Sequence, residues 1–268
     1  MVSPTGARRI KLDHPALPMT APEIGRAAAG AADAGANAVH VHVRDREGRH
    51  TLDRDAYVAA ITAIEREAGK KRLVIQATSE AFGVYQPAAQ IAAMQALSPR
   101  AVSVSIREVL PDAEHEVPAA DFFARLEREQ IGTQCIVYNV DELRYFYQLR
   151  SRGIIPGERV TLMLVLGRYP TGAVSKPLDL LPYLENLDPT QPHRWMTCAF
   201  GENEGACVLA AAALGGDMRV GFENNLQLAD GTMAANPAAL VAQAAEVVPR
   251  MARRLATFAE TSVALGCG

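Results

Sequence analysis

Short apolar runs rich in β-branched residues alternate with longer segments of helical character along the chain. The runs are typical of buried strands and fall at residues 38–43, 72–77, 101–105, 133–138, 159–166, 194–199 and 218–221. A weaker run at residues 2–6 is a candidate for an additional first strand. A strand and a helix recurring every roughly 25–35 residues is the repeat unit of a (β/α)8 barrel.

The segments between these runs carry helix start and stop signals. Thr20 and Glu23 are spaced as a capping box, and Asn236 stands as an N-cap before Pro237. We predict helices at 24–34, 53–67, 87–97, 119–129, 141–152 and 203–214, and a last helix running from 237 towards 258. Eight units predict a TIM barrel, a single (β/α)8 domain over residues 1–268. An open doubly wound sheet is the alternative, but its glycine-rich dinucleotide fingerprint is absent.

Composition and charge narrow the class of protein. The chain has 268 residues, 49% of them hydrophobic, which is ordinary for a globular protein, and a net charge of −3 argues against nucleic-acid binding. Apolar stretches reach only about ten residues, whereas a membrane span needs roughly 20. None of the four cysteines forms a C-x-x-C pair, and no signal peptide is evident. We therefore expect a cytoplasmic protein with reduced thiols.

The strongest chemical signal is the alternating run Val39-His40-Val41-His42-Val43. Residues two apart on a strand share a face, so the histidines would face the barrel lumen and the valines would pack on the helices. Barrel enzymes carry their sites at the carboxyl ends of the strands. A shared divalent metal explains two adjacent imidazoles there, because each neutral ring offers a lone pair. Two separately hydrogen-bonded histidines are the structural alternative.

A third ligand is expected from a strand that is near in space. A catalytic zinc has three protein ligands and one open position, and Glu223 lies at the end of the last predicted strand. In a closed barrel the last strand pairs with the first and the first with the second, so Glu223 can meet His40 and His42. We predict a His2Glu site for Zn2+, which other divalent ions also suit. A carboxylate paired with Arg219 or Arg44 is the alternative.

The chain resembles the β-keto acid cleavage enzymes, whose namesake acts on 3-keto-5-aminohexanoate. The resemblance covers nearly the whole chain. The motifs that carry it lie at residues 15–20, 34–36, 40–45, 76–78, 165–167, 214–216 and 219–225.

The resemblance implies a zinc-dependent (β/α)8 enzyme, usually a homotetramer, that converts a β-keto acid and acetyl-CoA into acetoacetate and a new acyl-CoA. His40, His42 and Glu223 match the zinc ligands of the family. Arg219 matches an arginine near the reacting centre, and Thr78 stands where the family often has a serine that touches the substrate. A structural partner for Glu223 or Asp45 is the alternative role of Arg219.

Asn224 departs from the family pattern, because relatives usually have an aspartate there that works with the arginine in proton transfer. A neutral amide cannot be a general base. Glu108 and Glu202 are the carboxylates expected near the barrel mouth that could replace it, and for each a solvated loop position is the alternative. The candidate catalytic residues are thus Arg219, Thr78, Asn224 and Glu108.

The predicted substrate contacts are Arg8, Ser105 and Glu202. Arg8 stands where the enzyme for the amino keto acid has a glutamate that holds the substrate ammonium. A cation would repel an amine and suit a second carboxylate or a polar tail, so we expect a different β-keto acid. Residues 200–204 carry two glutamates where many relatives have Gly-x-Gly-Arg, a change that disfavours a polyanion such as CoA.

Two further functions stay open from the sequence. One keeps the metal and uses water in place of CoA, as a hydrolase or a lyase. The other is a non-catalytic barrel that binds a metal. Cleavage of β-keto acids with and without acetyl-CoA distinguishes the three.

Overall fold

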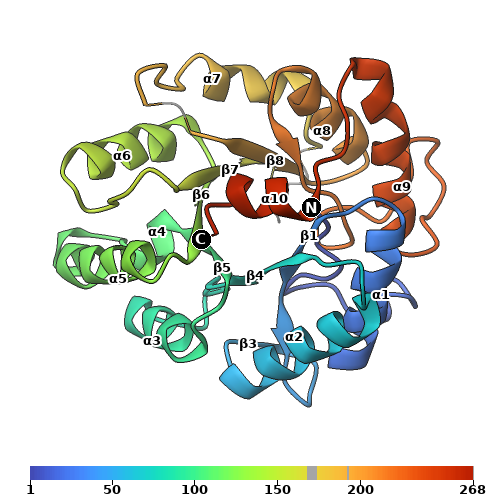
Figure 1. The fold of residues 1–268 in the computed structure, drawn as a ribbon, viewed down its shortest axis with the longest axis horizontal. Helices are drawn as coiled ribbons and strands as arrows, with labels where there is room; N and C mark the ends of the chain where they lie inside the picture. Colours follow the sequence, from blue (N-terminus) through green and yellow to red (C-terminus); the bar gives the residue numbers. More distant parts are fainter. Residues whose placement is uncertain (168–173, 192, 268) are drawn as a thin grey trace.

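The computed structural model describes residues 1–167, 174–191 and 193–267, and in them seven parallel strands form one sheet (Figure 1). In sheet order the strands are β1 (Ala38–Val41), β4 (Val74–Thr78), β5 (Ala101–Ser105), β6 (Gly132–Val137), β7 (Thr161–Leu166), β8 (Trp195–Ala199) and β9 (Asp217–Met218). The predicted (β/α)8 class is confirmed by this alternation of strand and helix and by the comparisons given below.

The N-terminal segment lies between the two edge strands of this sheet. Val2 is bridged in parallel to Val39 of β1 and to Val220, just beyond β9. The Val2 amide donates to the Ala38 carbonyl (2.9 Å), and the Ser3 amide donates to the Val220 carbonyl (2.8 Å). The predicted first strand at 2–6 is thus reduced to one bridged residue, which joins the edges of the sheet into a ring.

Apart from α10, the helices surround the sheet (Figure 1). The long ones are α1 (Ala21–Asp33), α2 (Arg54–Ala68), α3 (Pro87–Leu97), α5 (Glu116–Arg128), α6 (Val140–Ser151), α8 (Glu204–Ala213) and α9 (Pro237–Val247), and the short ones are α4 (Ile106–Val109), α7 (Leu181–Leu184) and α10 (Phe258–Ala264). Short 3-10 turns occupy Ala113–His115, Pro177–Leu180 and Val248–Met251. None of the described helices is long and apolar enough to cross a membrane.

Several predicted elements are wrong in extent; the strand expected at 218–221, for example, is β9 at Asp217–Met218. The last helix does not run to residue 258, because α9 ends at Val247 and the chain turns at Ala252, whose φ of 54° no α-helix accepts. The run at 38–43 is also broken: β1 ends at Val41, and Val43–Arg44 (β2) pairs antiparallel with His50–Thr51 (β3). This hairpin was not predicted.

The hydrophobic core has two layers that follow the alternation of strand side chains. Val39 and Val41 belong to the outer layer between sheet and helices. Met163 and Val74 belong to the inner layer, which also includes Leu265 after α10. In the view of Figure 1, α10 lies over the centre of the ring of strands. The C-terminal segment therefore fills the end of the barrel where the strands begin, and the carboxyl ends of the strands remain for a site.

Candidate active site

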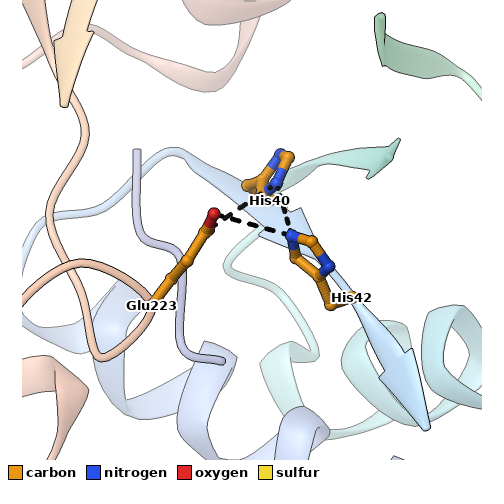
Figure 2. Close-up of side chains that lie close together, drawn as sticks. All are labelled: His40, His42 and Glu223. Carbon is orange, nitrogen blue, oxygen red and sulfur yellow. Dashed lines mark hydrogen bonds and ion pairs between the residues drawn. The ribbon is translucent and has the colours of Figure 1, made fainter. Parts of the chain in front are cut away.

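Three potential metal ligands converge at the carboxyl ends of the strands (Figure 2). The Nε2 atoms of His40 and His42 lie 3.2 Å apart. A carboxylate oxygen of Glu223 lies 3.7 Å from Nε2 of His40, and the other lies 3.6 Å from Nε2 of His42. All three residues are buried. The convergence expected from barrel closure is thus present.

The donor atoms fit a divalent metal. Ligands of a tetrahedral zinc, at about 2.0–2.1 Å from the metal, lie about 3.3 Å from one another, close to the spacing of the two imidazole nitrogens. His40 donates through Nδ1 to the side-chain oxygen of Gln76 (2.8 Å), so its Nε2 carries the lone pair. Burial lowers the pKa of His40 to about 3 and Arg219 acts in the same direction, so the ring is a neutral ligand at neutral pH.

The third ligand is kept ionised by its neighbours. Arg219 lies 3.4 Å from a Glu223 oxygen, and the Ser3 hydroxyl donates to the other oxygen. Burial acts to raise the pKa of Glu223, but the charge of Arg219 and the adjacent imidazoles outweigh it and hold that pKa well below its usual range. Arg219 is itself buried and also contacts Sγ of Cys198 at 3.2 Å.

The loop that carries Glu223 is shaped by close packing on the N-terminal segment. Gly221 has a φ of 149°, and a Cβ there would overlap the backbone of Ser3, so glycine is required. Glu204, at the start of α8, accepts from the Gly221 amide (3.0 Å) and from the Asn225 side chain (3.4 Å). These bonds hold the loop on both sides of Glu223.

Glu204 was misjudged from the sequence. The prediction that both glutamates of the 200–204 loop oppose a polyanion is wrong for Glu204, whose side chain is buried against the 221–225 backbone. Burial raises the pKa of Glu204 to about 8. Glu202 is exposed, as a solvated loop residue would be.

A cavity adjoins the triad and includes several of the predicted residues. Its wall contains His40 and Glu223 together with Thr78, Arg219 and Arg8. Arg8 is an exposed residue, and its guanidinium carbon lies over the ring of Phe82, 4.7 Å from the ring centroid.

Four other predicted residues are not among the described residues that line this cavity, namely Glu108, Ser105, Asn224 and Glu202. Glu108 accepts from the Ala81 amide (3.0 Å) and so holds the loop after β4. Ser105 and Asn224 are buried, and among the described residues their side-chain oxygens have no hydrogen-bond partner. The catalytic and substrate roles predicted from the sequence all stay predictions, namely those of Arg219, Thr78, Arg8, Glu108, Ser105, Asn224 and Glu202.

The sequence reasoning missed Glu80. Its carboxylate lies 3.4 Å from Nε2 of His42, and it lines the same cavity as the triad. Burial raises its pKa, although a quarter of its side chain remains exposed on the cavity side. The signal that could have found it is its place directly after β4, since strand ends are where barrel sites lie.

The chain belongs to the β-keto acid cleavage enzyme family, whose model matches residues 1–266. The resemblance expected from the sequence is thus confirmed. A 3-keto-5-aminohexanoate cleavage enzyme of Acetoanaerobium sticklandii is 27% identical over 97% of this chain and 95% of its own length. A 3-oxoadipate:acetyl-CoA acetyltransferase of Cupriavidus necator is 25% identical over 99% and 93%. In fold the chain is similar to ObcA, with a TM-score of 0.73 at 18% identity over 95% of this chain and 66% of the longer ObcA chain.

Replacing His40 by alanine tests the triad. We expect the His40→Ala variant to bind divalent metal more weakly by a larger factor than the roughly 10- to 100-fold typical of outer-shell changes, because only two ligands remain. Elemental analysis after dialysis against a metal buffer measures this. His193→Ala is the control. His193 lies just ahead of β8 and is hydrogen-bonded to the Val160 carbonyl. Undiminished metal in His40→Ala would exclude His40 as a ligand.

Glu204 gives a pH prediction. The pKa of Glu204 is 4.5 in the unfolded chain and about 8 in the folded protein. Between these values the folded protein keeps a proton on Glu204 that the unfolded chain has lost. The free energy of unfolding therefore falls as pH rises through this range. Glu204→Gln keeps the acceptor for the Gly221 amide and removes the titration. We expect the free energy of unfolding of Glu204→Gln, relative to wild type, to increase from pH 5 to 8 by up to about 1.4 kcal/mol per unit. Urea unfolding at several pH values measures this.

The exposed carboxylate Glu246 is the matched control for that series. Glu246→Gln is measured in the same pH series, and the increase expected for Glu204→Gln should exceed any change seen with this variant. If the Glu204→Gln curve also runs parallel to wild type, Glu204 has an ordinary pKa in the folded protein.

Proposed function

We propose that this protein cleaves a β-keto acid with acetyl-CoA, giving acetoacetate and the CoA ester of the remaining acyl group. The observation that carries the proposal is the convergence of His40, His42 and Glu223 at the open end of a barrel of the β-keto acid cleavage family. These three residues would hold the metal, with zinc the first choice for a His2Glu set. An oligomer, with a tetramer expected from the family resemblance, is part of the same proposal.

The metal, when bound, supplies a Lewis acid that polarises the keto and carboxylate oxygens of the substrate. The protein must then remove a proton from the carbon between those two groups. The resulting enolate carbon attacks the thioester carbonyl of acetyl-CoA and releases the CoA thiolate. The thiolate attacks the former keto carbonyl, the old carbon–carbon bond breaks, and acetoacetate and a new acyl-CoA leave.

Arg219 and Thr78 are placed to assist these steps from the cavity wall. The buried guanidinium of Arg219 would stabilise charge that develops on substrate oxygens, where the low local dielectric makes such a donor effective. The Thr78 hydroxyl already accepts from the Glu80 amide (3.2 Å), which leaves its own proton for a substrate oxygen.

Glu80 is the residue we propose as proton acceptor. Asn224 has no basic atom, and Glu108 and Glu202 lie outside the described cavity wall. Glu223 is committed to the metal, whereas Glu80 reaches the cavity beside His42 and has an exposed edge. A carboxylate oxygen of Glu80 would take the proton from the substrate carbon and return it to the product.

The loop after β8 presents less negative charge to a CoA molecule than the sequence suggested. Because Glu204 is buried in hydrogen bonds to the 221–225 loop, Glu202 is the carboxylate of the 200–204 segment that faces solvent. Arg8 and Arg9 line the cavity and bring positive charge to its walls. These features support acetyl-CoA as the acceptor.

The proposed reaction is tested with metal-loaded protein and a panel of β-keto acids, with and without acetyl-CoA. We expect acetoacetate and a new acyl-CoA to form only when acetyl-CoA is present, with both detected by mass spectrometry. Cleavage that proceeds equally without acetyl-CoA would show a water-using hydrolase or lyase instead. Bound metal without any cleavage across the panel would show a metal-binding barrel that lacks this activity.

Glu80→Gln tests the proton acceptor. An amide of nearly the same shape cannot accept the proton, so we expect kcat to fall about 10²- to 10⁴-fold, the usual contribution of a general base. Metal content should stay at the wild-type level, because the three ligands are untouched. Glu47→Gln, an exposed carboxylate in the β2–β3 turn, is the control. Wild-type kcat in Glu80→Gln would assign the proton transfer to another group.

A further inference from the structure

Arg107 stands across the barrel mouth from the metal triad. In the ring of strands, β6 is four places from the Val2 segment in either direction, and the triad residues flank that segment. Arg107 lies in α4, directly after β5, the neighbour of β6. β5 itself is three places from the Val2 segment, but the Arg107 guanidinium lies over the ring of Tyr138, just after β6, so this cation is on the far side of the mouth from the point where the head of a β-keto acid would bind.

The guanidinium of Arg107 is held by stacking. Its central carbon lies 3.7 Å from the centroid of the Tyr138 ring, just after β6, which is a close cation–π contact. Its Nη1 also donates to a Glu142 carboxylate oxygen at 3.4 Å and forms an ion pair with it. A guanidinium has five N–H donors, so this arrangement orients the group and leaves donors for a ligand.

The wall beside Arg107 is apolar. Ile136 of β6 and Val165 of β7 line the cavity, together with the rings of Tyr138 and Phe200. Such a surface suits a short methylene chain rather than a polar or branched polar tail. The cavity thus offers polar groups around the triad, an apolar wall and a stacked cation on the opposite side.

We propose that the substrate is a β-keto dicarboxylic acid and that Arg107 binds its distal carboxylate. The inference rests on the proposed function for the placement of the β-keto acid head at the triad. A bidentate guanidinium–carboxylate pair supplies both affinity and orientation, and the Tyr138 ring keeps the fork in plane. Arg107 is then a specificity-determining residue that sequence reasoning did not identify.

A phosphate of CoA is the other anion that a cation at this mouth could bind. The apolar wall and the stacking on a cavity-lining ring favour the carboxylate of a substrate that enters the barrel. Separate measurements on the keto acid and on acetyl-CoA distinguish the two sources.

The experiment compares matched acids that differ only in the distal carboxylate. Five-, six- and seven-carbon 3-oxo dicarboxylic acids and the corresponding 3-oxo monocarboxylic acids are titrated calorimetrically into the metal-loaded protein without acetyl-CoA. We expect wild type to prefer one diacid over its monoacid, and Arg107→Met to weaken binding of that diacid about 10- to 100-fold, the effect of a lost charge-assisted hydrogen bond. Binding of the monoacid should change less than about threefold, a difference of under 1 kcal/mol.

Two further variants sharpen the result. Arg107→Lys keeps the charge without the planar fork and should give an intermediate loss for the diacid. Arg144→Met removes an exposed arginine of α6 and should leave both acids unaffected. The KM for acetyl-CoA is measured for all variants in the cleavage assay.

Equal losses for diacid and monoacid in Arg107→Met, or no loss for either, would overturn the proposal. A raised KM for acetyl-CoA with unchanged diacid binding would overturn it as well and assign Arg107 to a CoA phosphate. Because binding is measured without turnover, selective diacid binding in a protein that forms no acyl-CoA would refute the proposed function and leave this inference standing.

Discussion

The insertion of the N-terminal segment between β1 and the 219–225 loop is the constraint on which the site depends. Val2 hydrogen-bonds to the β1 backbone, and Ser3 accepts from the Glu223 amide (3.3 Å) while its hydroxyl binds the Glu223 carboxylate. Residues far apart in the sequence thereby become neighbours across one bridging residue. Without this closure Glu223 would end on a free sheet edge, and His40 would have no carboxylate beside it.

Because this small cluster is buried, its polar and charged groups cost free energy unless they have partners. Two imidazole nitrogens at 3.2 Å share space with one carboxylate, which Arg219 already neutralises. His40 is held neutral by its surroundings, so it cannot supply a positive charge of its own. A divalent cation satisfies both lone pairs and the carboxylate at once, which is why the arrangement favours a metal over a hydrogen-bonded histidine pair.

The residues that sequence reasoning located are those whose position follows from periodicity or ring closure. Alternation along residues 39–43 placed His40 and His42 on one face, and the pairing of first and last strands placed Glu223 beside them. Glu80 and Arg107 were missed because each follows its strand in a segment without periodicity. Glu204 was misplaced because residue identity alone does not show whether a carboxylate faces solvent or accepts a hydrogen bond from the backbone of another loop.

The two sides of the barrel mouth are built differently, and in the proposed reaction this would separate reactivity from selectivity. The triad side depends on strand pairing and on a glycine that tolerates no side chain, so changes there disturb closure of the ring. The opposite side carries Arg107 on α4, a single turn anchored by the buried Ile106 and Val109. A residue on such a turn can change without altering the sheet. Substrate choice can therefore vary at this turn while the metal-binding geometry is kept.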